Sequence, residues 1–226
     1  MSSLQLKETL LQPFRRPSLL AWALVFTGIF YLANMQANLY DIANPRWVIT
    51  MATLILLSPF FNGGFILLLQ AQRKGEKLSP GQAIVRTFSN YGSLVAGEFL
   101  VNIIVVAGGI LFVIPGIYFG LRLMFYKQEI LIGGARGTAA LKMSVARTRQ
   151  WRETLFLFAS LSLFYLPTVA IFFVPVSLVW DLYALIASAL TFAWTNIMLT
   201  RIYLDADELG ANKLDANKLD ANERVG

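Results

Sequence analysis

The chain has 226 residues, of which 57% are hydrophobic and only 14% are charged. Its mean hydropathy is +0.60, whereas roughly a quarter of the residues in a soluble globular domain are Asp, Glu, Lys or Arg. Cys and His are both absent, which excludes disulfides, thiolate nucleophiles and every metal, haem or acid–base site built on those residues. For the same reason we expect no cofactor. The net charge of +6 is typical of basic loops beside a membrane, so we expect no nucleic-acid partner.

The apolar residues occur in long uninterrupted segments. Residues 18–40 and 47–72 carry no charge, and each exceeds the roughly 20 residues that a spanning helix requires. The strands of a membrane barrel alternate apolar and polar residues and are shorter, so these segments are helices. The first segment is too long for the apolar core of a signal peptide, and we expect it to stay as an anchor. The sequence therefore predicts an all-α polytopic membrane protein with about six transmembrane helices, near 18–40, 47–72, 93–113, 116–133, 153–173 and 176–204.

Basic residues predict the orientation of these spans. They precede span one and fill the loops after spans two and four, whereas Arg46 is the single basic residue in the loops of the other side. Because positive loops stay in the cytoplasm, we expect both termini there. A helical domain over 1–205 would then end in a polar cytoplasmic tail over 206–226.

Both basic loops also contain short amphipathic patterns. Ser79-Pro80-Gly81-Gln82 is typical of a capped helix start, and Leu141 and Val145 repeat at helical spacing. We expect two helices at the membrane interface, either binding anionic lipid or an acidic partner, or merely fixing topology and packing. The candidate contacts are Lys142, Arg147, Arg149, Arg152, Arg73 and Lys74.

Polar residues inside hydrophobic spans are costly and are therefore candidates for function. The candidates are Glu98, Arg122, Lys127, Glu129, Asp181 and Asn62. The helical rise places Glu98 and Lys127 at similar depth on neighbouring spans, so we expect them to meet. Arg122 lies nearer the opposite surface, where Asp181 is a possible partner; transport paths and snorkelling are the alternatives.

Span two contains a potential interruption at Ser58-Pro59, followed by Asn62-Gly63-Gly64. Transporters use such breaks to expose backbone groups to substrate, but Pro and Gly also occur where helices pack closely. We favour packing, because no second matching interruption is present. The small residues Ala107-Gly108-Gly109 in span three predict another close helix contact.

The central third of the chain contains a set of short motifs, namely Ile114-Pro115-Gly116-Ile117-Tyr118, Arg122-Leu123, Ala140-Leu141, Ser144 and Thr148-Arg149. Together they resemble a widespread family of bacterial six-span membrane proteins. The family is similar to the membrane domain attached to some glycerophosphodiester phosphodiesterases. The resemblance implies a six-span fold in a bacterial-type cell or internal membrane, but no activity. The family often has an acidic residue where this chain has Gly133, and Glu129 is a candidate substitute one helical turn earlier.

The polar C-terminal tail contains Ala211-Asn212-Lys213-Leu214-Asp215, repeated without change at 216–220. A period of five fits no helical face well, so we expect a flexible tail, or alternatively docking through its leucines.

No nucleotide loop, metal cluster or nucleophile–base pair emerges, so we expect no enzyme. The first hypothesis is a scaffold or accessory protein that binds membrane lipids, a larger membrane complex or copies of itself. The alternative is a small transporter or channel that uses the span-two break and the embedded charges.

Overall fold

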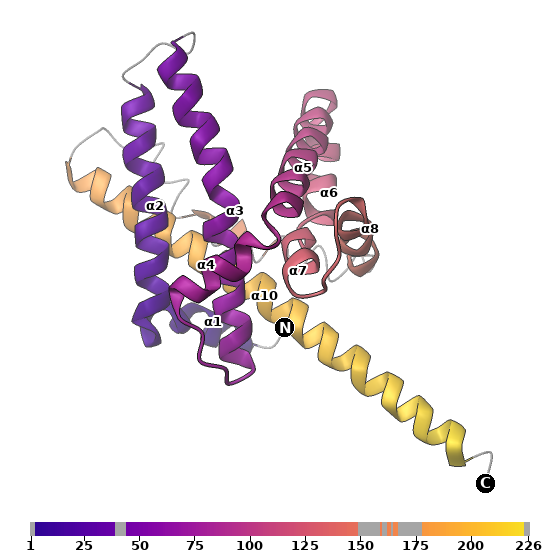
Figure 1. Cartoon of the computed structure of the whole chain (residues 1–226). Coiled ribbons are helices and arrows are strands. Elements are labelled where there is room, and N and C mark those ends of the chain that lie inside the picture. The colour runs from indigo at the N-terminus through magenta and orange to yellow at the C-terminus, as the bar shows by residue number, and fades with distance from the viewer. Residues whose placement is uncertain are drawn as a thin grey trace.

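The computed structural model describes residues 3–38, 44–148, 159, 162–163, 165–166 and 178–223 of the chain. Over these residues the protein is all-α, as predicted, and contains no strand (Figure 1). The helices are α1 (Ser3–Arg15), α2 (Pro17–Asn38), α3 (Pro45–Arg73), α4 (Pro80–Phe88), α5 (Tyr91–Leu111), α6 (Val113–Arg122), α7 (Tyr126–Leu131), α8 (Thr138–Arg147) and α10 (Leu178–Glu223).

Helices α2 and α3 form an antiparallel pair, and α10 crosses it obliquely (Figure 1). At one end of the pair the Tyr31 hydroxyl donates to Asp181 Oδ1 at 2.5 Å. At the other end Arg73 binds Asp205 at 2.8 Å, so α10 runs from one end of the pair to the other. A core that includes Leu19, Phe65 and Ile197, all fully buried, lies where the three helices meet.

Helix α3 continues through the predicted interruption, with Pro59 inside it. A Cβ added at Gly63 would lie 2.4 Å from Thr87 Cγ2, and one at Gly64 would lie 2.7 Å from Trp22 Cζ2. The two glycines therefore let α4 and α2 approach the α3 backbone, which confirms the packing interpretation of this motif.

Helices α5 and α6 form a hairpin where the sequence predicts the spans 93–113 and 116–133, and the chain reverses before the boundary between those two predicted spans. Phe112, with extended φ −161° and ψ 143°, ends α5 and precedes α6, so Pro115 lies in the first turn of α6. A Cβ at Gly116 would lie 2.8 Å from the Gly109 nitrogen, and one at Gly108 only 3.1 Å from Gly116 Cα. The predicted close contact of the Gly108-Gly109 surface is thus confirmed.

Among the described residues, fewer helices than the predicted six have the length and apolarity to cross a bilayer. They are α3, α5 and Asp181–Glu208 within α10, with a fourth if α1 and α2, which meet at a bend of 85°, count as one span. The predicted span at 116–133 is broken into α6 and α7, of ten and six residues; about 15 and 9 Å are too short to cross. The predicted span at 153–173 lies almost wholly outside the described residues.

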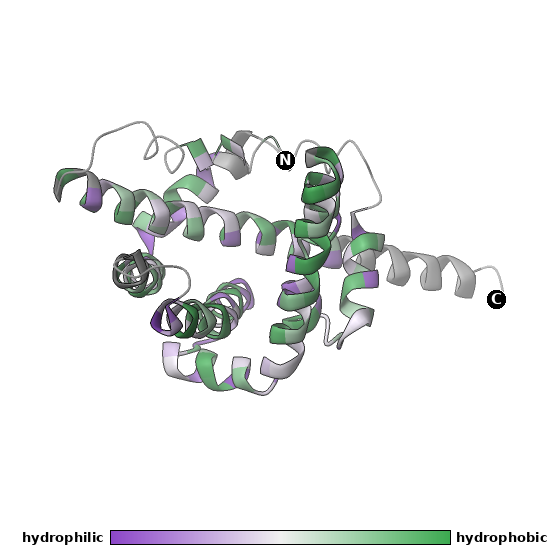
Figure 2. Ribbon diagram, turned by 90° about the horizontal axis from the view of Figure 1, so that it is seen from above, coloured by the Kyte–Doolittle hydropathy of each residue, from purple (hydrophilic) through white to green (hydrophobic). Residues whose placement is uncertain are grey.

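The exposed surface of the hairpin is strongly apolar. Ile110 and Ile114 are 80% and 79% exposed, and Leu111 and Phe112 are 70% and 74% exposed. Figure 2, viewed nearly along α2 and α3, shows the apolar hairpin and α10 running across the view. So large a continuous apolar surface suits lipid and not water, and the chain is a membrane protein with helices that do not form one parallel bundle.

The polar C-terminal repeat is part of α10, which extends to Glu223. This differs from the flexible tail expected from its sequence. The repeat contains neither Gly nor Pro, so nothing in it breaks a helix already begun upstream.

Exchanging the hairpin glycines for alanine tests the close contact. We expect Gly116→Ala to lower the free energy of unfolding by about 1–3 kcal/mol, because its Cβ meets the backbone of α5. Gly109→Ala is the matched control, since its Cβ would meet nothing within 4 Å, and it should be neutral or stabilising by up to about 1 kcal/mol. Denaturation in detergent measures both; equal effects would contradict the contact.

Candidate functional site

Most of the embedded polar residues gather around α7, in an arrangement that we call the polar junction. It is made of three hydrogen-bonded groups, centred on Arg122, Glu129 and Glu98. They connect α7 and its flanking turns to α3, α5, α8 and α10.

The first group closes the break between α6 and α7. The Ser144 hydroxyl, from α8, accepts from the Phe125 N–H at 3.1 Å and donates to the Arg122 carbonyl at 3.0 Å. The Thr148 hydroxyl lies 3.2 Å from the same carbonyl. Ser144 and Thr148 are 0% and 4% exposed. Buried backbone groups need hydrogen-bond partners. Because the helix is interrupted between α6 and α7, Ser144 and Thr148 supply partners to the Phe125 N–H and the Arg122 carbonyl.

The Arg122 side chain belongs to the same group. Its guanidinium donates to the Thr148 carbonyl and lies 5.7 Å from the Tyr118 ring centroid. Asp181 instead accepts from Tyr31, so the predicted Arg122–Asp181 pair is wrong. Arg122 ends α6 beside α8, whereas Asp181 begins the part of α10 that packs on α2.

The second group surrounds the carboxylate of Glu129, which is only 1% exposed. Arg147 Nε lies 2.8 Å from Oε1, and the Tyr203 hydroxyl donates to Oε2 at 3.0 Å. The Arg147 guanidinium also lies 4.0 Å from the Tyr203 ring centroid, a favourable cation–π geometry. A Cβ at Gly133 would lie 2.8 Å from Glu129 Oε2, so the carboxylate occupies the space beside that glycine.

The third group confirms the predicted Glu98–Lys127 pair. Lys127 Nζ lies 3.4 Å from the Glu98 carboxylate, and the two side chains are 19% and 17% exposed. Ser58 donates to Glu98 Oε1 at 3.2 Å and accepts from Asn62 at 3.1 Å. Asn62 thus serves as the end of a hydrogen-bond chain that fixes α3 to α5 and α7.

The six basic candidates fall into three sets of two. Arg147 binds Glu129 at 2.8 Å, and Arg73 binds Asp205 and Glu208 at 2.8 and 3.2 Å. For these two candidates the packing alternative therefore holds, and not the lipid or partner contact. Arg149 and Arg152 lie outside the described residues. Among the described residues, seven exposed basic side chains with no ion pair form what we call the basic collar: Lys7, Arg15, Arg16, Lys74, Lys77, Arg136 and Lys142.

Apolar side chains are exposed beside this collar. Helix α4 buries Ala83 and Thr87 and turns its apolar face outward, with Val85 and Phe88 71% and 66% exposed. Phe14 of α1 and Met143 of α8 are 58% and 44% exposed. Short helices that present apolar and basic side chains together are typical of a membrane interface.

Comparisons with protein-family models, with curated proteins and with solved structures find no match. In the part of the chain that the structure describes, no three acidic side chains are grouped as a metal ion would require. The polar junction and the basic collar are therefore the candidate functional features of the described residues.

Sequence reasoning missed several members of the polar junction. Tyr203 has no distinguishing local pattern, since one hydroxyl in an apolar helix is common, and the sequence indicates Ser58 only as part of the Ser58-Pro59 interruption. It indicates Ser144 only through the family resemblance, and Thr148 through that resemblance and its helical spacing after Leu141 and Val145. The signal that was available is their four-residue spacing, which puts both hydroxyls on one face of α8.

Removing the Ser144 hydroxyl tests the repair of the broken segment. We expect Ser144→Ala to cost about 1–3 kcal/mol of unfolding free energy, because the Phe125 N–H and the Arg122 carbonyl each lose a hydrogen bond. Ser89→Ala, at an exposed helix end, should change it by no more than about 0.5 kcal/mol. Similar losses for the two variants would show that α8 does not stabilise the break.

A double-mutant cycle tests the buried ion pair. Glu129→Gln and Arg147→Met should each cost about 3–5 kcal/mol, because each leaves an uncompensated buried charge or lost partner. The double variant should cost clearly less than the sum, by roughly 1–3 kcal/mol of coupling. Unfolding free energies in detergent provide the measurement, and strictly additive losses would contradict the pairing.

Proposed function

We propose that this protein is a non-enzymatic integral membrane scaffold or accessory component. In this proposal the basic collar binds anionic lipid headgroups and thereby organises lipid or holds a membrane complex. The proposed topology places the collar and both termini in the cytoplasm of a bacterial-type cell or internal membrane, following the distribution of basic loops.

The observation that carries this proposal is the direction of the side chains on α1, α4 and α8. Each of these helices turns apolar side chains away from the protein, and α1 and α8 themselves carry collar residues. Lys74 and Lys77 immediately precede α4. A basic residue near an anionic surface contributes about 1 kcal/mol of binding free energy. The collar therefore supplies charge next to helices suited to lie in the headgroup region.

The arrangement of the embedded charges favours a scaffold over the alternative of a small transporter or channel. A transport path requires polar groups around a wet cavity. Asn62 is instead bonded to Ser58, Arg122 to Thr148 and Asp181 to Tyr31. Groups that already satisfy one another support a packed interior more than a permeation route.

Neutralising the collar tests lipid binding. We expect the combined variant Lys74→Gln, Lys77→Gln, Arg136→Gln and Lys142→Gln to retain at least about tenfold less phosphatidylglycerol than the wild type, because four favourable charges are lost. Native mass spectrometry of protein from mixed phosphatidylcholine–phosphatidylglycerol nanodiscs measures the retention. Arg46→Gln, in the first turn of α3 and outside the collar, should have little effect; an unchanged quadruple variant would contradict the proposal.

Gentle extraction tests the scaffold role itself. Protein taken from native membranes in mild detergent should migrate with other membrane proteins in a fixed ratio, as native sizing and mass spectrometry would reveal. A particle of this chain and lipid alone, together with solute flux across reconstituted vesicles, would favour the transporter alternative.

A further inference from the structure

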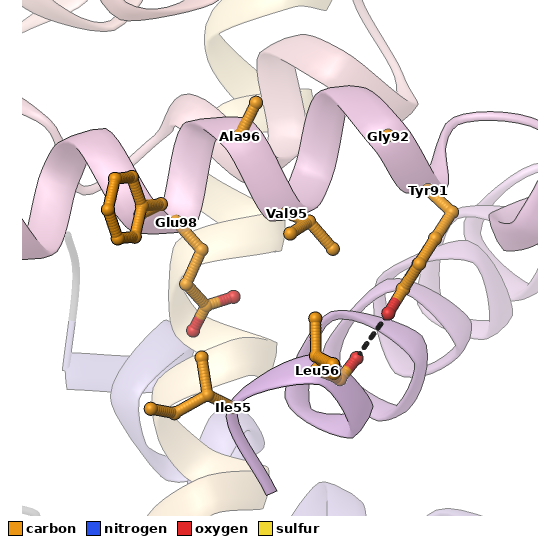
Figure 3. A pocket seen from close by; sticks show the side chains of 8 residues that line it. Ile55, Leu56, Tyr91, Gly92, Val95, Ala96 and Glu98 are labelled. Carbon is orange, nitrogen blue, oxygen red and sulfur yellow. Dashed lines mark hydrogen bonds between the residues drawn. The ribbon is translucent and has the colours of Figure 1, made fainter. Parts of the chain in front are cut away.

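The α5–α6 hairpin projects from the rest of the described structure. At its base the Tyr91 hydroxyl donates to the Leu56 carbonyl of α3 at 2.8 Å, and Glu98 points toward the same helix (Figure 3). Beyond Glu98, Gly108 is the one buried residue of α5, and it lies against Gly116 of α6. Because most of the remaining surface of the hairpin is apolar and exposed, lipid surrounds it.

Two polar residues lie at the same level on the two arms of the hairpin. Asn102 on α5 and Arg122 at the end of α6 are each ten residues from Phe112, where the chain reverses. The glycine contacts described above hold the arms in this register. Between Asn102 and Arg122 the sequence contains no charged residue, and Tyr118 is its single polar side chain. The apolar part of the hairpin is therefore about 15 Å long, half of the roughly 30 Å hydrocarbon core of a bilayer.

Features of the membrane surface lie at the level of Arg122. Ser144 of α8 donates to the Arg122 carbonyl at 3.0 Å, and Lys142 of the basic collar lies two residues from Ser144 on the same helix. Lys142 and the neighbouring Met143 are both exposed, a combination typical of the headgroup region. With the collar among the headgroups, the tip of the hairpin lies at most about 15 Å deeper, near the bilayer midplane.

The tip has the side chains expected of a membrane interior. Ile110, Phe112 and Ile114 are 80%, 74% and 79% exposed, and a tip that emerged from the opposite face of the bilayer would present them to water. The first turn of α3, which the topology places at that face, instead exposes Pro45 and Arg46. The tip of the hairpin therefore differs from the part of the chain that meets water there.

The backbone of the reversal also suits an apolar environment. The reversal uses the single residue Phe112, whose N–H donates to the Gly108 carbonyl at 3.0 Å and whose carbonyl accepts from Gly116 at 3.4 Å. Pro115 has no N–H to leave unpaired. So short a reversal costs less in hydrocarbon than a longer loop would, because backbone groups that water does not reach must be paired within the chain.

We propose that the α5–α6 hairpin is re-entrant. It enters the bilayer from the side of the basic collar, reaches the midplane with its apolar tip and returns to the same side, so that its surface binds the acyl chains of one leaflet only. The hairpin runs across the direction of α2 and α3 (Figure 2), so it does not follow that pair through the bilayer. This inference goes beyond the proposed function, since it uses the collar only as a marker of the membrane surface and does not depend on its affinity for anionic lipid.

A depth scan along one face of α5 tests the proposal on the full chain. The chain contains no Cys, so Asn102→Cys, Val106→Cys and Ile110→Cys each place one nitroxide label at an exposed position, four residues apart. In phosphatidylcholine–phosphatidylglycerol vesicles, relaxation of the label by oxygen and by a water-soluble nickel chelate measures its depth. We expect the depth to increase from Asn102 to Ile110 by up to about 12 Å.

A hairpin that crosses the bilayer gives the opposite order, because Asn102 then lies near the midplane and Ile110 near the far surface. That order, or equal access of the nickel chelate to all three positions, would overturn the proposal. Lys142→Cys, in the collar, is the surface reference and should be as accessible to the chelate as Asn102→Cys. Any two of the three positions give the sign of the gradient, so the scan decides the matter even where one variant fails to fold.

Discussion

The fold depends on how the chain satisfies its backbone where the fourth apolar segment breaks. Between Arg122 and Tyr126 the helix stops, and in an apolar environment each unpaired backbone group would cost several kcal/mol. Ser144 and Thr148 meet this demand from α8. The basic loop that precedes and contains α8 is therefore part of the structural core and not merely a connection between spans.

The position of α8 at the break also brings the remaining buried charged side chains into contact. Arg147, at the end of α8, reaches Glu129 on α7, and Tyr203 reaches the same carboxylate from α10. Lys127, also on α7, binds Glu98 and so connects the junction to α5 and α3. The six-residue helix α7 thereby joins the hairpin to the α2–α3 pair. The embedded charges, which are costly to bury alone, compensate one another. The basic residues that remain unpaired are left on the surface, where they form the basic collar.

The sequence predicts those features that depend on distance along one helix. Helical rise alone places Glu98 opposite Lys127, and uninterrupted apolarity identifies α3, α5 and α10. The sequence does not predict contacts that depend on how a helix is rotated about its axis or on a partner distant along the chain. Arg122 and Asp181 have suitable depths but face different neighbours. The reversal at Phe112 was missed because Pro115 and Gly116, which look like a turn, serve as a first-turn proline and a contact glycine.

Helix α10 has a mechanical consequence. Its 46 residues run without a break from Leu178 to Glu223, a rod of about 69 Å whose middle carries Tyr203 and Asp207 against Arg147. The helix contains no Pro, and its single Gly, Gly210, lies between these contacts and the repeat. A displacement of the polar end is therefore transmitted to the buried Glu129 contacts only as far as the helix stays straight at Gly210.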